Sequence, residues 1–390
     1  MNGPSDTRVP STAIRVFFYV QHLLGIGHLA RASRIVDALM ADGFAVTLVT
    51  GGMPVTGFPK AAVDHVALPP IAVGDSGFSG LVDANGKAVD EAFLDSRRDL
   101  LLAAFRDRRP DIVILEAFPF GRRQVRFELL PLIAAIEAMS PKPLLLTSLR
   151  DILQERAKPE RDAETVDMVR RHFDRVLVHG DPEFARLEDT FPLAASIADR
   201  VVYTGLVAAP RPQPAIDPFD VVVSAGGGAV GAELVGAAIE AAALLPDLGR
   251  WCVITGPNLQ SDDFARLAAL APAHVTVTRF RTDFPSLLRS ATLSISQAGY
   301  NTVCDILQAG CRAVLVPFAT GGETEQTARA ERLEALGLAS VLLESALSGE
   351  NMVTAIRDAL IVKGNAHVSR LQLEGAKNTA AILRDLVRAR

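Results

Sequence analysis

The stretch VFFYVQHLLGIGHLARASRIVDAL, residues 16–39, contains the transition that decides the fold of the N-terminal half. Its first five residues, Val16–Val20, form an apolar run that predicts a buried β-strand. From Leu29 to Asp42 apolar residues recur at helical spacing, which predicts an α-helix. Between the two lies Gly25-Ile26-Gly27-His28, so the strand should enter the helix through a glycine-rich turn with an imidazole at its tip.

Short apolar runs alternate with longer amphipathic runs along the rest of the chain. Further strands are predicted at residues 45–50, 112–115, 144–148, 175–178 and 201–203, and, in the C-terminal half, at 221–224, 251–255, 275–279, 293–296, 313–317 and 339–343. Strand–helix alternation is typical of an α/β fold with parallel sheets covered on both faces. Residues 51–87, rich in Gly and Pro, are expected to form a long irregular excursion.

The segment AAPRPQP, residues 208–214, interrupts this alternation. Its three alternating prolines cannot continue a helix or a central strand, so we expect a linker there. A chain of 390 residues is also too long for one ordinary core. The sequence therefore predicts two doubly wound Rossmann-like domains, residues 1–208 and 216–370, followed by a C-terminal segment, 371–390. Ligands of such folds bind beyond the carboxyl ends of the strands.

Composition excludes several classes of function. The formal net charge is −5, so no overall field would attract nucleic acid, and we expect no nucleic-acid partner. Cys252, Cys304 and Cys311 contain no C-x-x-C pair, which argues against a zinc site or a disulfide framework. Reduced thiols and the lack of a sufficiently long apolar stretch favour a cytoplasmic protein without a membrane-spanning helix.

Two residues in the N-terminal half are candidates for catalysis. His28 follows the first strand, and an imidazole with an ordinary pKa of about 6.5 suits proton transfer near neutrality. Glu116 ends the strand predicted at 112–115, so it should face the same cleft and orient the imidazole. The alternative for His28 is that it only caps or packs the turn.

A glycine-rich loop in the C-terminal half, SAGGGAVG at residues 224–231, follows a predicted strand and precedes a predicted helix. Backbone N–H groups of Gly226, Gly227 and Gly228 and the helix dipole could cradle a phosphate. No Gly-Lys-Ser/Thr follows, and no acidic residue ends the next strand, so the loop is neither a Walker A nor a dinucleotide-binding fingerprint. A loop that is tight for packing reasons is the alternative.

Two further loops in this half carry polar groups. Asp305 follows the turn SQAGYNT and lies in or just beyond the first turn of a predicted helix, where its carboxylate could accept hydrogen bonds from a diol. Glu325 and Gln326 end the loop PFATGGETEQ and together offer acceptors and donors for sugar hydroxyls. Each feature is weak evidence when taken alone.

These motifs together resemble GT-B glycosyltransferases, and most closely glycosyltransferase family 28, whose best-known member adds N-acetylglucosamine to a lipid-linked peptidoglycan precursor. The resemblance is carried by RFRTDFPSLLRSATLSISQAGYNTVCDILQAG (residues 279–310), VPFATGGETEQTARAERL (316–333) and GIGH (25–28). EAFPFGRR and TSLRDIL (116–123 and 147–153) resemble an uncharacterised bacterial branch of predicted glycosyltransferases. The resemblance implies that the last helix, about 376–387, crosses back to the N-terminal domain.

The resemblance also implies roles for individual positions. His28 would be a general base or an acceptor-positioning group, and Asp305 would bind the ribose diol in place of the family's usual Glu. Gln297 replaces the usual Arg of Ser-Arg-Ala-Gly, which removes a fixed positive charge. The residues expected at the nucleotide-sugar site are Gly27, Gly226, Gly227, Gly228, Phe280, Gly299, Asn301, Thr302, Asp305, Glu325 and Gln326.

The resulting expectation is an inverting glycosyltransferase that uses a nucleotide diphosphate donor, a UDP-sugar, and neither a metal nor another cofactor. Its acceptor could be a lipid-linked sugar, another glycan or a small molecule. Two alternatives stay open: a UDP-sugar 2-epimerase of the same fold, and a non-catalytic nucleotide-sugar-binding protein.

Peripheral contact with the inner face of the membrane is a separate expectation. Phe118, Phe120, Arg122, Arg123 and Arg126 mix apolar and basic groups that could rest on a bilayer. Equally, the phenylalanines could belong to the core and the arginines to a solvated helix face.

Overall fold

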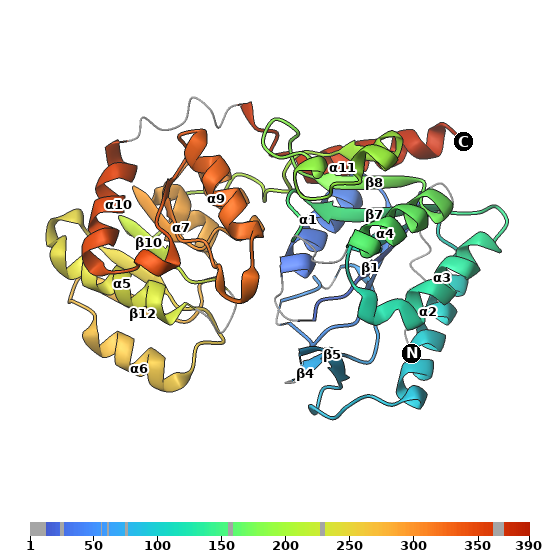
Figure 1. Ribbon diagram of the computed structural model, residues 1–390, viewed down its shortest axis with the longest axis horizontal. Coiled ribbons are helices and arrows are strands. Elements are labelled where there is room, and N and C mark those ends of the chain that lie inside the picture. Colours follow the sequence, from blue (N-terminus) through green and yellow to red (C-terminus); the bar gives the residue numbers. More distant parts are fainter. Residues whose placement is uncertain are drawn as a thin grey trace, which may run out of the picture.

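The computed structural model describes residues 13–23, 27–55, 57–60, 62–74, 77–154, 159–226, 231–361 and 370–390. Each half of the chain forms a parallel β-sheet with helices on both faces, and the two halves lie side by side (Figure 1). The expected α/β architecture with two Rossmann-like domains is confirmed.

The first sheet has seven strands, all paired in parallel. Their order is β3 (Asp64–Ala67), β2 (Ala45–Thr50), β1 (Arg15–Val20), β6 (Ile112–Glu116), β7 (Leu144–Arg150), β8 (Arg175–His179) and β9 (Val201–Tyr203). Alternate residues of β1 enter two different cores, because successive side chains of a strand point to opposite faces. One face packs on α1 (Gly27–Ala41), and the other packs on α2 (Glu91–Arg108), α3 (Arg126–Glu137) and α4 (Pro159–His172).

Residues 51–87 are more regular than the sequence predicted. They contain β3, which extends the edge of the first sheet, and a small antiparallel pair, β4 (Ala72–Gly74) and β5 (Gly77–Val82). The expectation of an irregular excursion was wrong here. Short, partly exposed strands lack the continuous apolar run that marks a buried strand, so the periodicity did not reveal them.

The second sheet has six parallel strands in the order β12 (Val275–Thr278), β11 (Trp251–Ile254), β10 (Val221–Ser224), β13 (Leu293–Ser296), β14 (Arg312–Leu315) and β15 (Ser340–Val341). Helices α5 (Ala232–Leu244), α6 (Ser261–Leu270) and α10 (Gly349–Ile361) pack on one face. Helices α7 (Phe284–Ser290), α8 (Tyr300–Ala309) and α9 (Glu325–Ala335) pack on the other.

Strand order reverses at one point in each sheet, between β1 and β6 and between β10 and β13. Chain connections leave such a point in opposite directions, so a crevice forms at the carboxyl ends of these strands, where ligands of doubly wound folds bind. The loops that follow β1, β6, β10 and β13 are therefore the places to look for a site.

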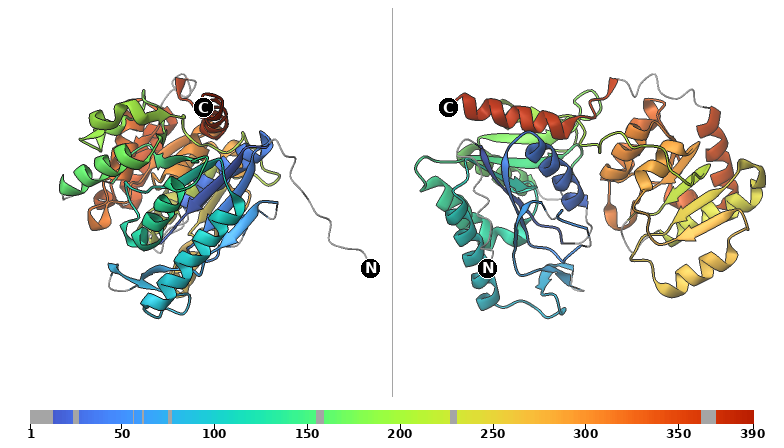
Figure 2. Two further views of the ribbon diagram at one scale, coloured as in Figure 1. Left: turned by 90° about the vertical axis from the view of Figure 1, so that its right-hand side faces the viewer. Right: turned by 180° about the vertical axis from the view of Figure 1, so that it is seen from behind.

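The last helix, α11 (Gly375–Arg388), lies on the first domain and packs along α1 (Figures 1 and 2). The backbone N–H of Gly375 donates to the carbonyl of Leu206 at 2.9 Å, and the Asn378 side chain donates to the carbonyl of Thr204 at 2.8 Å. The C-terminal helix thus crosses back as expected. None of the described helices is both long and apolar enough to span a bilayer.

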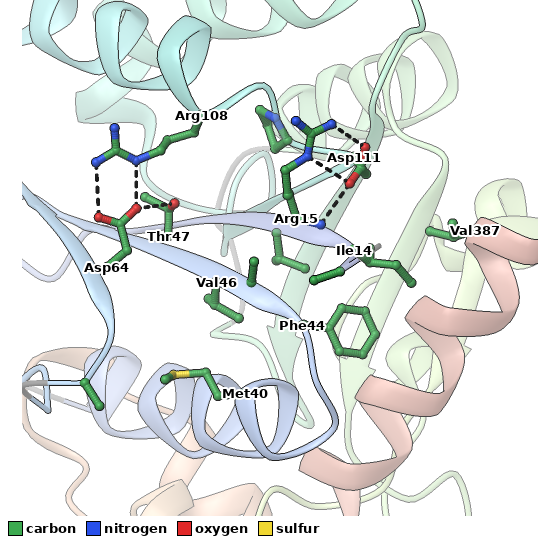
Figure 3. Close-up of a pocket in the computed structure, with 15 residues that line it drawn as sticks. Ile14, Arg15, Met40, Phe44, Val46, Thr47, Asp64, Arg108, Asp111 and Val387 are labelled. Atoms are coloured by element: carbon green, nitrogen blue, oxygen red, sulfur yellow. Dashed lines mark hydrogen bonds and ion pairs between the residues drawn. The ribbon is translucent and has the colours of Figure 1, made fainter. Parts of the chain in front are cut away.

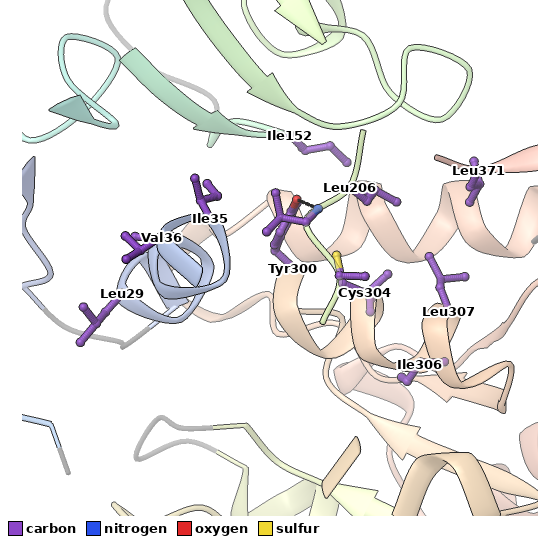
Figure 4. Packing of buried hydrophobic residues seen from close by; sticks show 14 of the residues in the cluster. Leu29, Ile35, Val36, Ile152, Leu206, Tyr300, Cys304, Ile306, Leu307 and Leu371 are labelled. Carbon is purple, nitrogen blue, oxygen red and sulfur yellow. Dashed lines mark hydrogen bonds between the residues drawn. The ribbon is translucent and has the colours of Figure 1, made fainter. Parts of the chain in front are cut away.

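One apolar core is continuous from the first domain into the second. It includes Leu29 and Ile35 of α1, Tyr300 and Cys304 of α8, and Leu371, which precedes α11 (Figure 4). The facing surfaces of α1 and α8 are therefore held together by packing, and side chains at the starts of these two helices are brought close together.

Candidate functional site

His28 and Glu116 meet at the switch point of the first sheet. His28 lies in the first turn of α1, and Glu116 is the last residue of β6, the strand next to β1. The Nδ1 atom of His28 is 3.0 Å from Oε1 of Glu116. The carboxylate is fully buried, whereas the imidazole keeps 20% of its surface exposed. The structure therefore brings together the two residues expected in catalysis.

Glu116 is held as a carboxylate by its neighbours. Arg31, one turn after His28 on α1, donates to Oε1, and the Ser148 hydroxyl at 2.5 Å donates to Oε2. Burial alone would raise the pKa of Glu116, but the charge of Arg31 and the hydrogen bonds from His28 and Ser148 lower this pKa to about 2. Glu116 is therefore ionised near neutral pH and can only accept hydrogen bonds.

This charge state determines the tautomer of His28. Because the carboxylate only accepts, Nδ1 of His28 must carry the proton, and Nε2 is left with a free lone pair. Burial, helped by the charge of Arg122, lowers the pKa of His28 to about 3 despite Glu116. The imidazole is thus neutral at pH 7, and its pKa lies well below the value of about 6.5 that the sequence alone suggested.

A second histidine supports Glu116 from the interior. Ser148 gives its only proton to Glu116, so its oxygen must accept the hydrogen bond from Nε2 of His179 at 2.9 Å. Thr204 lies 2.8 Å from Nδ1 of His179. Burial lowers the pKa of His179 to about 3, so this imidazole is also neutral. The result is a buried chain of hydrogen bonds that ends at His28.

Tyr300 of α8 connects this chain to the second domain. Its hydroxyl donates to the carbonyl of His179 at 2.8 Å and accepts from the backbone N–H of Val207 at 2.8 Å. The guanidinium of Arg31 lies over the Tyr300 ring, 5.1 Å from the centroid. The orientation of the His28 site therefore depends on how α8 packs.

The second switch point holds part of the glycine-rich loop. Gly226 follows β10 with a φ of +77°, and a Cβ there would lie 2.9 Å from Oε1 of Gln297. Only glycine fits both the backbone angle and this contact. Gly231 caps the start of α5. Gly227 and Gly228 lie outside the described residues, so the proposed phosphate cradle is described only at its two ends.

Asp305 does not face an open crevice in this structure. It is the sixth residue of α8, and both of its carboxylate oxygens accept from Nη2 of Arg34 on α1, at 2.7 and 2.9 Å. The side chain is buried between the two domains, and burial raises its pKa against the opposing effect of Arg34. The carboxylate expected to bind a ribose diol thus forms an ion pair across the domains.

Glu325 is likewise bound by arginines. Its Oε1 accepts from Nη2 of Arg329 at 2.7 Å, and its Oε2 contacts Arg150, which ends β7 of the first domain. Arg329 also binds Asp151 of the first domain, at 2.6 and 3.0 Å. Neighbouring Gln326 accepts from the backbone N–H of Phe318 at 3.2 Å.

The remaining candidates are spread over the second domain. Asn301, in the first turn of α8, donates from Nδ2 to the carbonyl of Gly27 at 3.0 Å, which joins the starts of α8 and α1. Gly299 caps α8, and Thr302 lies half-buried in its first turn. Phe280 follows β12 with its side chain 63% exposed. Among the described residues, Phe280 forms no hydrogen bond or ring contact with the other candidates.

Phe118 and Phe120 are core residues. Both are buried, and their rings contact Phe173 and Phe191, so they cannot rest on a membrane. The alternative that placed them in the core holds. Arg123 and Arg126 both bind Glu164 of α4.

Arg31 and Arg34 are the residues that sequence reasoning missed at this site. Together with His28 they recur every three residues, which places all three on one face of a helix. That spacing could have indicated their role, because it places two cationic side chains on the same helix face as the candidate catalytic His28.

A separate cavity of about 870 Å³ opens at the other end of the first sheet (Figure 3). Arg15, Ala45, Asp64 and Asp111, at or just before the amino ends of their strands, line it. The cavity is therefore remote from His28, which follows a carboxyl end. In the part of the chain that is described, no group of three or more His, Cys, Asp or Glu side chains could hold a metal ion.

The fold and the paired switch points define the chain as a protein of the GT-B class. Solved structures agree: the calicheamicin glycosyltransferase CalG4 aligns over 96% of this chain and 98% of its own, with a TM-score of 0.61 and 18% identity. MurG of Acinetobacter baumannii aligns over 97% of this chain and 100% of its own, with a TM-score of 0.58 and 16% identity. Structural similarity to proteins of such low sequence identity supports the fold alone.

Residues 222–380 match the family model of the glycosyltransferase family 28 C-terminal domain, so this part of the chain is similar to that domain. Curated relatives include UDP-N-acetylglucosamine–N-acetylmuramyl-(pentapeptide) pyrophosphoryl-undecaprenol N-acetylglucosamine transferases. That of Brucella anthropi is 32% identical over 42% of this chain and 45% of the relative. The enzyme of Mesorhizobium japonicum is 36% identical over 36% of this chain and 38% of the relative. The matched segment thus spans less than half the length of these relatives.

Proposed function

We propose that this chain is a glycosyltransferase that moves a sugar from a UDP-sugar, such as a UDP-N-acetylhexosamine, to an acceptor hydroxyl. The observation that carries the proposal is the His28–Glu116 pair at 3.0 Å, placed at a switch point that adjoins a domain similar to the family 28 C-terminal domain. The two halves supply different parts: an acid–base pair in the first, and a glycine-rich loop with a helix start in the second.

The proposed chemistry is a single displacement with inversion. The acceptor oxygen forms a bond to the anomeric carbon, the bond from that carbon to the diphosphate breaks, and Nε2 of His28 takes the hydroxyl proton. Glu116 holds Nδ1–H and stabilises the imidazolium that forms. Backbone N–H groups at the start of α5 and its helix dipole receive the charge of the leaving diphosphate, without a metal ion.

The test compares His28→Gln with His172→Gln. His172 is a matched control because it also contacts a carboxylate through Nδ1, that of Glu137 at 2.7 Å, but lies on the surface at the end of α4. With UDP-N-acetylglucosamine as donor and N-acetylmuramyl-(pentapeptide) pyrophosphoryl-undecaprenol as first acceptor, His28→Gln should lower kcat at least about a hundredfold. Calorimetric UDP affinity should be unchanged in both variants.

Three outcomes would contradict parts of the proposal. Near-normal turnover by His28→Gln removes this residue from the mechanism. Retention of the anomeric configuration, followed by proton NMR of the product, excludes a single displacement. Loss of turnover in EDTA that added Mg²⁺ restores excludes the metal-free route. A lipid-linked acceptor further predicts that the chain sediments with vesicles containing that acceptor.

A further inference from the structure

Arg122 differs from the other guanidinium groups around the His28 site because, within the described part of the chain, it forms no ion pair. It lies six residues after Glu116 in the loop that follows β6, with a left-handed φ of +60°. Its Nε atom is buried, and among the described residues nothing accepts a hydrogen bond from it. By contrast, the adjacent Arg123 forms an ion pair with Glu164 at 2.6 Å.

The other arginines around the site bind carboxylates. Arg31 binds Glu116, Arg150 binds Glu325, and Arg329 binds Asp151 and Glu325. Arg122 forms no such ion pair among the described residues. An uncompensated charge in a buried place is unfavourable unless a counter-ion joins it.

The charge of Arg122 acts directly on His28. Burial lowers the pKa of Arg122 to about 10, with the charges of Arg150 and Arg31 adding to the effect and that of Glu116 opposing it. The Arg122 charge in turn lowers the pKa of His28. Glu116, which lies 3.0 Å from His28, ends β6, and Arg122 lies in the loop that follows this strand, so an anion bound by Arg122 would act on His28.

We propose that Arg122 binds a phosphate group beside His28. A guanidinium pairs with phosphate oxygens through two parallel N–H···O bonds, which suits a partly buried arginine without a carboxylate partner. This inference extends the proposed function, and the phosphate would belong either to the leaving nucleoside diphosphate or to the acceptor. Arg122 would also supply a positive charge to the site, where Gln297 replaces an arginine of the resembled family.

Phosphate binding would at the same time activate the base. A bound anion neutralises Arg122 and adds its own negative charge, and both effects favour the imidazolium. A base works best when its pKa is near the working pH, and that of His28 is far below it in the empty site. Proton abstraction would thus become efficient only when the phosphate is in place.

The first test is calorimetric titration of the full chain with inorganic pyrophosphate. Arg122→Met should weaken binding about tenfold or more, because a charge-assisted pair is lost. Arg123→Met, the matched control, should bind like the original chain. Arg122→Met should fold, with a melting temperature no lower than that of the original chain, because it removes an unpaired buried charge. Arg122→Lys, which keeps the charge, should recover part of the affinity.

The second test measures the pKa of His28 by NMR with and without pyrophosphate. The charged groups that act on this imidazole are Glu116, Arg31 and Arg122. Pyrophosphate should raise the His28 pKa in the original chain and in Arg123→Met, and much less in Arg122→Met. Neither test depends on turnover, so its failure is distinguishable from failure of the proposed function.

The source of the phosphate follows from a parallel titration with UDP. If Arg122→Met weakens UDP and pyrophosphate binding alike, the site holds the donor diphosphate. If only pyrophosphate binding is weakened, the site serves the acceptor. Absence of pyrophosphate binding by the original chain, or equal affinities of Arg122→Met and Arg123→Met, would overturn the proposal.

Discussion

Replacing Ser148 with alanine tests the buried hydrogen-bond chain behind His28. The Ser148 hydroxyl is 2.5 Å from Glu116 and 2.9 Å from His179, and all three side chains are fully buried. A hydrogen bond to a charged group contributes about 1.5–3 kcal/mol, and the N–H of His179 would be left without an acceptor. Ser148→Ala should therefore lower the free energy of unfolding by about 2–4 kcal/mol.

The assay is urea-induced unfolding at pH 7 followed by circular dichroism, and the matched control is Thr147→Val. Thr147 is the preceding residue of β7 and is also fully buried, but its hydroxyl has no hydrogen-bond partner among the described residues. Valine has nearly the same shape, so this variant should be at least as stable as the original chain. The interpretation fails if Ser148→Ala loses less than about 0.5 kcal/mol, or if both variants lose equally.

Other predictions concern acidity, the domain junction and a backbone turn. Between pH 7 and pH 5 the unfolded chain protonates His179, ordinary pKa about 6.5, while the folded chain does not, so this residue alone should lower the free energy of unfolding by about 2 kcal/mol. His179→Gln should remove that part of the urea-unfolding difference, while the part that comes from His28, whose folded pKa is also about 3, should remain. Arg329→Met leaves buried Asp151 without its counter-ion and should destabilise by about 3–5 kcal/mol in the same assay; a loss below about 1 kcal/mol would contradict a buried pair. Gly205→Ala should lower the melting temperature more than Gly43→Ala. Both glycines have a positive φ, but of the two only Gly205 would bring a Cβ close to another residue, 2.8 Å from the backbone carbonyl oxygen of Gln372. Equal losses in melting temperature would mean that the structure relieves this clash.

Much of the fold was predictable because it depends on local pattern. The run from Val16 to Val20 and the alternation that follows it predicted parallel sheets, and the strands expected in the first sheet lie within two residues of those observed. The strand β3 was missed, because its partly exposed residues lack an apolar run. Position after a strand was also enough to put His28 and Glu116 at the same end of the sheet.

The ion pairs and protonation states of the site were less predictable, because they depend on charged residues that are distant in the chain. Asp305 was correctly placed on a helix, but its partner Arg34 is 271 residues away in the chain. The pKa of His28 likewise depends on burial and on Arg122, neither of which is visible in the turn Gly25-Ile26-Gly27-His28. An isolated motif therefore suggested a histidine ready for proton transfer, where the structure holds one that stays neutral well below pH 7.

The sequence by itself determined the class of fold and the residue types in the loops that follow its strands, because apolar periodicity and glycine turns act over a few residues. Only the tertiary structure decided which charges meet: Glu116 with Arg31, Glu325 with Arg150, and Arg122 with none of the carboxylates that the structure describes. The physical reason is that ionisation depends on burial and on neighbours within a few ångströms. Those neighbours come from elements far apart in the chain, α1 and β6 for the first pair and α9 and β7 for the second, and no local stretch of the chain encodes these contacts.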